Sequence, residues 1–96
     1  NHGFLLTPYG WRLSPAFDIN PDPESSGLSL NITENDNRLD PDFALEAAPF
    51  FRVGHREGKE IITKTRDVVS LWPAFADRYG ISSFEKELMS RAFIAQ

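Results

Sequence analysis

The sequence predicts an α+β fold, with an N-terminal β-hairpin and one further strand followed by three α-helices. Three patterns support this prediction. Two β-favouring runs flank a Pro/Gly turn near the start, residues 28–32 alternate between apolar and polar, and apolar residues recur at helical spacing from residue 40 onward. We expect a single domain over residues 1–96, with the hairpin, a loop and the strand in 1–32 and the helical part in 40–96.

The hairpin is predicted over the first thirteen residues. Phe4–Leu6 and Trp11–Leu13 are apolar, β-favouring runs, and the turn Thr7–Gly10 has proline at its second position and glycine at its fourth. A loop of this length pairs Leu6 with Trp11, and the same register pairs Phe4 with Leu13.

This register also brings two polar residues together at the open end of the hairpin. Extended backwards, it sets Asn1 opposite Ala16, with Asp18 just beyond. Directly opposed residues on antiparallel strands lie roughly 4.5–5.5 Å apart, so we expect the Asn1 and Asp18 side chains to approach one volume that suits a cation. The alternative from the pattern alone is an ordinary surface hairpin with solvated polar ends.

The same stretch resembles the HipA-like serine/threonine protein kinases. NHGFLL, followed by GWRLSPAFDINP, is similar to the end of that family's catalytic loop and to its metal-binding loop. In the family an Asp-x-x-x-x-Asn loop runs into a hairpin, and a Ser/Thr-Pro-x-Tyr/Phe-Asp-Ile/Leu segment replaces the Asp-Phe-Gly motif of ordinary protein kinases. Asn1 matches the loop asparagine and Ser14–Ile19 matches the second motif. The motifs cover residues 1–20, and the rest resembles the family's C-terminal helical region more diffusely.

The resemblance implies a fold, a site and partners. The chain would be the C-terminal portion of a kinase-like C-lobe, with Asp18 chelating a Mg²⁺ that bridges the ATP β- and γ-phosphates and Asn1 holding a second Mg²⁺. The full-length protein would use ATP and Mg²⁺ to phosphorylate a protein serine. Family members are toxins of bacterial toxin–antitoxin pairs linked to persistence and are restrained by a small DNA-binding antitoxin (HipB-like), so such a partner is implied too.

Other groups that a kinase needs are missing from the sequence. By the resemblance, the catalytic aspartate would lie upstream of Asn1, and the nucleotide-gripping lysine and the phosphate-covering loop are also absent. Because the sequence starts at Asn1 without methionine, we expect a fragment or processed product of a longer protein. Phosphoryl transfer depends on positioning and electrostatic stabilisation by all these groups together, so the chain alone is expected to hold no catalytic residue and to be inactive.

Composition limits the other classes of function. The 96 residues are 41% hydrophobic and include eight phenylalanines, enough for a modest core. No apolar run approaches the roughly 18 residues of a membrane span, and the absence of cysteine is compatible with a cytosolic origin, so we expect a cytoplasmic protein without membrane contact. The formal charge of −4 disfavours direct nucleic-acid binding by this chain alone.

The region after Asp18 is expected to contain a loop, a strand and a second loop. Residues 20–27 hold two prolines, two serines and a glycine, which disfavour regular structure. Leu28–Ile32 alternates for the length of one half-buried strand. Thr33–Leu39 is polar and is predicted to be a surface loop.

The first helix should start at Asp40, an N-cap acceptor followed by Pro41 at the first helical position. Pro49 should kink this helix or begin a new turn, and Gly54 should end it. Its expected buried face consists of Phe43, Ala44, Ala47, Ala48 and Phe51.

Two further helices complete the prediction. The longest should run from about Arg56 to Tyr79 with a bend at Pro73, and the last should begin in a capping box formed by Ser82 and Glu85. The apolar stripe of the long helix is expected to be buried and consists of Ile61, Thr65, Val68, Trp72, Phe75 and Tyr79. The last helix should bury Phe84, Leu88, Met89, Ala92 and Phe93. We expect the hairpin to pack its apolar face on these helices.

Two other functions stay open. Residues 67–96 have the order helix, Gly-containing turn and capped helix, which is also found in helical DNA-binding or regulatory modules. The candidate recognition helix, residues 84–95, has only Lys86 and Arg91 beside two glutamates, fewer donors than such a helix usually presents. The third possibility is a structural module without a site.

Overall fold

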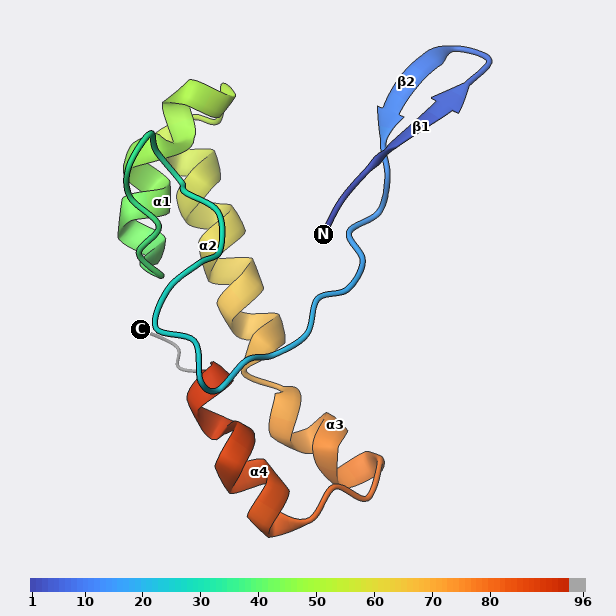
Figure 1. Cartoon of the computed structure of the whole chain (residues 1–96), viewed down its shortest axis with the longest axis vertical. Coiled ribbons are helices and arrows are strands. Elements are labelled where there is room, and N and C mark those ends of the chain that lie inside the picture. The colour runs from blue at the N-terminus through green and yellow to red at the C-terminus, as the bar shows by residue number, and fades with distance from the viewer. Residues whose placement is uncertain (94–96) are drawn as a thin grey trace.

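The structure is a computed structural model that describes residues 1–93, and it is of the α+β class (Figure 1). Within this range the chain forms one antiparallel hairpin, four α-helices and two 3₁₀-helices. In chain order these are β1 (Phe4–Thr7), β2 (Gly10–Leu13), α1 (Pro41–Ala47), η1 (Ala48–Phe51), α2 (His55–Val69), α3 (Trp72–Arg78), α4 (Ser83–Met89) and η2 (Ser90–Phe93). No helix among residues 1–93 is both long enough and apolar enough to span a membrane.

The predicted hairpin and its register are confirmed, with Leu6 opposite Trp11 and Phe4 opposite Leu13. The turn is closed by Thr7, whose hydroxyl donates to the Gly10 carbonyl at 2.8 Å and accepts from the Tyr9 amide at 3.2 Å. Gly10 has a φ of 107°, a conformation that residues with a Cβ rarely adopt. The turn therefore depends on glycine at this position.

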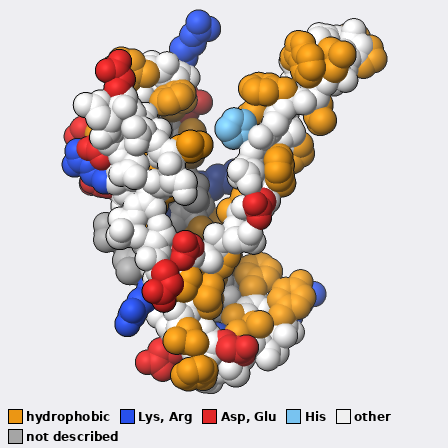
Figure 2. All heavy atoms as spheres, in the orientation of Figure 1, with side chains coloured by type: hydrophobic (Ala, Val, Ile, Leu, Met, Phe, Trp, Pro, Cys, Tyr) orange, Lys and Arg blue, Asp and Glu red, His pale blue; other side chains and the backbone are white. Residues whose placement is uncertain are grey.

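The expectation that the hairpin packs on the helices is wrong. In Figure 1 the hairpin points away from the helical part, and in Figure 2 its apolar side chains are exposed on the surface. Leu6 and Trp11 are 70% and 69% exposed. A two-stranded ribbon buries little of either face by itself, and residues 14–40, which join it to the helices, form no helix or strand.

The predicted strand at Leu28–Ile32 is also wrong. These residues begin a loop that is closed by Asn37, whose carbonyl accepts from the Leu28 amide at 2.9 Å and whose side chain donates to the Leu28 carbonyl at 2.6 Å. Leu30 is 77% exposed. Alternation makes a strand only where a partner strand pairs with its backbone groups, and here the backbone carbonyl and the side-chain amide of Asn37 pair with Leu28 instead.

The start of α1 is as predicted, since Asp40 Oδ1 accepts from the Asp42 amide at 2.9 Å and Pro41 is the first helical residue. The predicted buried face is right for Ala47 and Ala48, whereas Ala44 and Phe51 are exposed and Phe43 is half-buried. Pro49 lies in the 3₁₀-helix η1. The turn after it ends at Arg52, which has a left-handed φ of 59°. Gly54 is therefore not a C-cap but the N-cap of α2.

The single long helix expected over 56–79 is two helices, α2 and α3, which are separated at Ser70 and Leu71. Pro73 lies in the first turn of α3, where its missing N–H costs no helical hydrogen bond. The expected buried stripe is not covered, because Val68 is 60% and Tyr79 is 75% exposed and only Trp72 is half-buried. Helical spacing shows which residues share a face, but burial needs a neighbouring element over that face.

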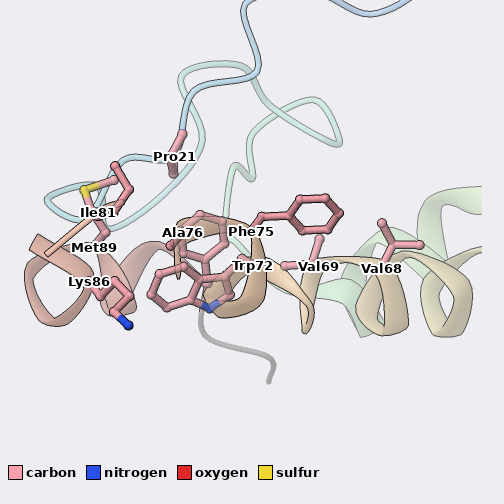
Figure 3. A pocket seen from close by; sticks show the side chains of 10 residues that line it. Pro21, Val68, Val69, Trp72, Phe75, Ala76, Ile81, Lys86 and Met89 are labelled. Atoms are coloured by element: carbon pink, nitrogen blue, oxygen red, sulfur yellow. The ribbon is translucent and has the colours of Figure 1, made fainter. Parts of the chain in front are cut away.

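Helices α3 and α4 form an antiparallel pair around an apolar hollow of about 430 Å³. Figure 3 shows that Pro21, from the loop after Asp18, reaches this hollow from the side opposite the helices. At its edge the Trp72 and Phe93 rings stack with centroids 4.5 Å apart. The other lining residues are apolar except for Lys86: Val68, Val69, Phe75, Ala76, Ile81 and Met89.

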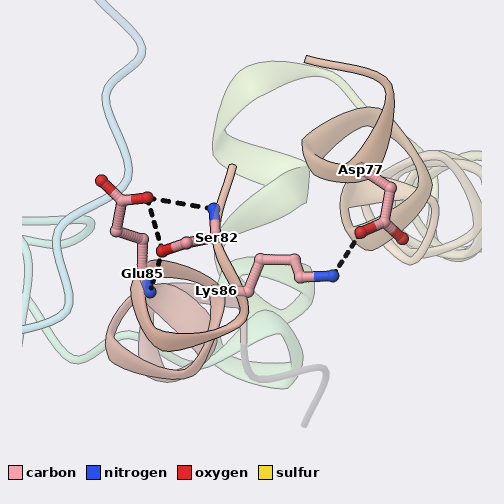
Figure 4. Close-up of polar contacts among 4 residues, drawn as sticks. All are labelled: Asp77, Ser82, Glu85 and Lys86. Carbon is pink, nitrogen blue, oxygen red and sulfur yellow. Dashed lines mark hydrogen bonds and ion pairs between the residues drawn. The ribbon is translucent and has the colours of Figure 1, made fainter. Parts of the chain in front are cut away.

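The predicted capping box at the start of α4 is confirmed (Figure 4). The Ser82 amide donates to Glu85 Oε2 at 3.0 Å, and the Glu85 amide donates to Ser82 Oγ at 3.2 Å. Gly80 has the left-handed φ of 73° expected of a helix stop. Lys86 pairs with Asp77 of α3 across the turn. The far end of the predicted last helix falls on residues 94–96, which lie outside the described residues.

The core is small for a chain of this length. Its buried hydrophobic residues, among those described, are Leu45, Ala47 and Ala48. The radius of gyration is 16.0 Å, whereas a compact chain of this length has about 12.5 Å. The accessible surface is 8418 Å², against about 5,600 Å² for a compact monomer of this mass. The molecule therefore leaves much apolar surface uncovered.

Candidate functional site

The predicted approach of Asn1 to Asp18 is found in the structure. The Asn1 side-chain amide donates to Asp18 Oδ2 at 2.8 Å. These two residues stand 17 positions apart, and the hairpin brings them together. Both side chains are exposed, so the contact lies on the molecular surface.

The backbone pairing that produces this contact continues beyond the strands. The Ser14 amide donates to the Gly3 carbonyl at 2.8 Å, and the Gly3 amide donates to the Ser14 hydroxyl at 2.9 Å. The next bond runs from the Phe17 amide to the Asn1 carbonyl at 2.9 Å. The expected pairing of Asn1 with Ala16 is therefore wrong by one residue. Pro15 has no N–H and restricts the residue before it, and one extra residue on this side then moves Asp18 closer to Asn1.

Asp18 itself has a left-handed backbone, with a φ of 52°. Aspartate tolerates this region better than most residues with a Cβ. Its second carboxylate oxygen, Oδ1, accepts from the side-chain amide of Asn20 at 2.5 Å. The carboxylate is thus held between two asparagine amides.

Sequence reasoning missed Asn20. The only signal available was its position two residues after an aspartate, in the loop before Pro21. Asp and Asn side chains often bond to groups two residues away, but such pairs are common in loops. The spacing alone gave no reason to place Asn20 at a site.

The donor atoms at this cluster suit a hard cation such as Mg²⁺. A carboxylate offers about four lone-pair sites, of which the two amide hydrogen bonds take two. The Asn1 amide nitrogen donates the hydrogen bond to Asp18, which leaves the Asn1 amide oxygen available as a second ligand atom for a cation. Mg²⁺ prefers such oxygens and takes its remaining ligands from phosphate and water.

The same cluster is too small to hold a cation tightly without further ligands. In residues 1–93 no group of three or more His, Cys, Asp or Glu side chains is placed to bind a metal. Neither histidine lies in such a group, and His2 contacts the Phe4 ring edge-on. A cation at Asp18 therefore needs ligands from a bound phosphate.

The helical end of the molecule presents a different surface. The hollow between α3 and α4 is lined by apolar side chains and has no group of polar atoms to orient a small substrate. Lys86, one of the two basic residues of the candidate recognition helix, is half-buried and paired with Asp77. That pairing leaves Arg91 as the exposed basic side chain between Ser83 and Phe93.

Comparisons of the chain with protein-family models, with curated proteins and with solved structures found no match. The kinase resemblance is thus carried by the motifs of residues 1–20.

Proposed function

We propose that this chain is the C-terminal part of a HipA-like serine/threonine protein kinase, that Asp18 and Asn1 supply ligands for Mg²⁺ and ATP, and that the chain is inactive by itself. The observation that carries the proposal is the 2.8 Å hydrogen bond between Asn1 and Asp18. These are the two residues that the family motifs mark as metal ligands, and they are far apart in sequence. The hairpin brings the two side chains together, and this is the arrangement that the resemblance implies for two metal ligands.

The chemistry of the two residues supports this role. Asp18 contributes the negative charge that attracts a divalent cation, and Asn1 contributes a neutral oxygen beside it. Mg²⁺ bound there would neutralise charge on the phosphate oxygens during phosphoryl transfer. The hairpin fixes the spacing of the two side chains, which is the positioning that such a reaction requires.

The uncovered apolar surface also supports a chain that packs against more protein. The accessible surface exceeds that of a compact monomer by about 2,800 Å², and large hydrophobic side chains are exposed on the hairpin, in the irregular segment and on the helices. Under the proposal the rest of the kinase covers part of it and provides the catalytic aspartate and the nucleotide-binding lysine. The parent would act in the cytoplasm on a protein serine and would be restrained by a small DNA-binding antitoxin.

The second candidate is a helical DNA-binding or regulatory module. Its supporting observation is the α3–α4 pair, joined by a short turn that contains Gly80 and by the Ser82–Glu85 capping box. The pairing of Lys86 with Asp77 weakens it, because a recognition helix needs free donors.

Asp18→Asn in the parent protein separates the two functions. The substitution keeps the size of the side chain but removes the charge that holds the cation, so phosphoryl transfer should fall to background while the fold persists. Lys86→Ala combined with Arg91→Ala is the matched control and should leave phosphoryl transfer nearly unchanged. Autophosphorylation with radiolabelled ATP measures both, and a filter-binding assay over a range of salt concentrations measures DNA affinity.

The opposite result favours the second candidate. If Asp18→Asn retains full phosphoryl transfer, the metal assignment is wrong and the kinase proposal fails with it. If the Lys86/Arg91 variant loses DNA affinity and has a shallower salt dependence, the helical pair is the functional element.

A further inference from the structure

The Asp18 carboxylate has no packed surroundings that would fix its orientation. It lies between the largely exposed side chains of Phe17 and Ile19, in a segment without helix or strand. Its side chain is held by two hydrogen bonds, one from Asn1 to Oδ2 and one from Asn20 to Oδ1. A ligand carboxylate must be held to within about 0.5 Å of its productive place, and these two amides are the groups that contact the Asp18 carboxylate oxygens through side-chain hydrogen bonds.

We propose that Asn20 is a positioning residue, which holds the Asp18 carboxylate in the orientation needed to bind Mg²⁺ with ATP. This inference rests on the proposed function and adds a residue that the family motifs did not supply. Asn20 touches the ligand side chain and acts through it. Groups that hydrogen-bond to a metal-binding carboxylate commonly tune its affinity for the metal.

The side chain of Asn20 suits this task. An amide donates a hydrogen bond without adding charge, so it orients the carboxylate and leaves its attraction for a cation intact. A carboxylate at the same place would repel Asp18, and a cation would compete with the metal. Asparagine is thus the residue type that holds Asp18 at the least cost to metal binding.

The backbone around Asn20 also restricts its position. The following residue, Pro21, disfavours the helical region for Asn20. Pro21 lines the apolar hollow with Trp72 and Met89, which links this loop to the helices. In the sequence, Asn20 therefore lies between Asp18, whose carboxylate it contacts, and Pro21, through which the loop meets the helical part.

The experiment compares Asn20→Ala and Asn20→Leu in the full-length parent kinase. Alanine removes the amide, and leucine keeps a branched side chain of similar shape without a donor. Asn35→Ala is the matched control, since Asn35 is an exposed loop asparagine at a distance in sequence from Asp18. Asp18→Asn reports on the proposed function itself. Circular dichroism melts verify that each variant is folded.

Two measurements report on metal binding. Both Asn20 variants should raise the Mg²⁺ concentration for half-maximal phosphorylation by about 10–100-fold, while the rate at saturating Mg²⁺ approaches that of the parent. Electron paramagnetic resonance titration of Mn²⁺, with a non-hydrolysable ATP analogue present, should show weakened binding by a similar factor. The Asn35 variant should match the parent in both measurements, because Asn35 is remote in sequence from Asp18. A change confined to the Asn20 variants would show an effect on metal binding and not a general loss of stability.

The outcomes separate the two proposals. If Asp18→Asn abolishes activity and Mn²⁺ binding while either Asn20 variant binds Mn²⁺ as the parent does, the positioning role is overturned and the proposed function stands. If Asn35→Ala weakens Mn²⁺ binding as much as Asn20→Ala, the effect is not specific and the positioning role is overturned. If Asp18→Asn keeps activity and Mn²⁺ binding, the proposed function fails and this inference fails with it.

Discussion

Gly58 lies where α1 and α2 pack against each other. A Cβ built at this position would lie 2.6 Å from Leu45 Cδ1, well inside van der Waals contact. Gly58 is buried in α2, and Leu45 is one of the few buried hydrophobic residues of α1. The glycine lets α1 and α2 approach, although glycine inside a helix costs about 1 kcal/mol relative to alanine.

Gly58→Ala therefore has two opposing effects. The new methyl group gains about 1 kcal/mol of helix propensity, but overpacking against Leu45 costs about 2 kcal/mol. We expect Gly58→Ala to lower the free energy of unfolding by about 1 kcal/mol in the native chain. In a Leu45→Ala background the same substitution should raise the free energy of unfolding by about 1 kcal/mol. Denaturant unfolding followed by circular dichroism measures both. Additive effects in the two backgrounds would show that the contact does not limit packing.

At the scale of elements, two of the α-helices, α1 and α4, begin at a side-chain cap. Asp40 caps α1, and the Ser82–Glu85 box caps α4. The hydrogen bonds that Glu85 accepts from the Ser82 hydroxyl and amide lower the pKa of its carboxyl below the usual value. A carboxyl whose folded pKa is lowered stabilises the helix start above its unfolded pKa of about 4.3. That stabilisation is lost as the pH falls through the lowered folded value.

The capping box thus predicts an acid-sensitive step in the stability of α4. The melting temperature of the chain should fall below about pH 4.5, and Glu85→Gln should reduce this fall, because glutamine serves in a capping box without titrating. Glu87→Gln, on the same helix but outside the box, is the control. Arg38 also lowers the pKa of Asp36 through a side-chain hydrogen bond, so part of the acid sensitivity should persist in the Glu85 variant. Thermal melts between pH 3 and pH 7 test the difference, and an unchanged pH profile in Glu85→Gln would contradict it.

At the scale of the whole molecule, the chain is extended, 44 × 33 × 25 Å. The hairpin and the helical part are joined by a long irregular segment, so apolar groups on both remain in contact with solvent (Figure 2). Exposed apolar patches of this extent are typical of interaction surfaces, ligand grooves and aggregation-prone surfaces.

This exposure predicts that the 96-residue chain binds hydrophobic dyes strongly while folded. Anilinonaphthalene sulfonate fluorescence should rise on addition of the chain at neutral pH, as it does for proteins that leave apolar surface open. Replacing Leu6 and Trp11 by threonine should lower the signal without loss of helical circular dichroism, because these side chains lie on the hairpin away from the helices. Dye binding no greater than that of a compact protein of equal mass would contradict this account of the surface.

Much of the local structure follows from the sequence alone, because it depends on neighbouring residues. The hairpin register comes from a four-residue turn, and the starts of α1 and α4 come from Asp40 and Ser82. The register also brings Asn1 near Asp18, to within the one-residue offset at its open end. The predicted approach of Asn1 to Asp18 is found, but the hydrogen bond from Asn20 to Asp18 was not predicted, since nothing in a loop sequence shows which oxygen its amide will reach.

The tertiary structure decided burial, pairing and the division of the helices. Among the described residues, Leu28–Ile32 alternates like a strand but pairs with no other strand. The stripe from Ile61 to Tyr79 has helical spacing but is half-buried only at Trp72, whose ring stacks on Phe93. The one-residue offset that pairs Asn1 with Phe17 arises from Pro15 and from the Ser14 hydroxyl in three dimensions. A periodic pattern records which side chains share a face, and only the arrangement of the other elements determines whether that face is covered.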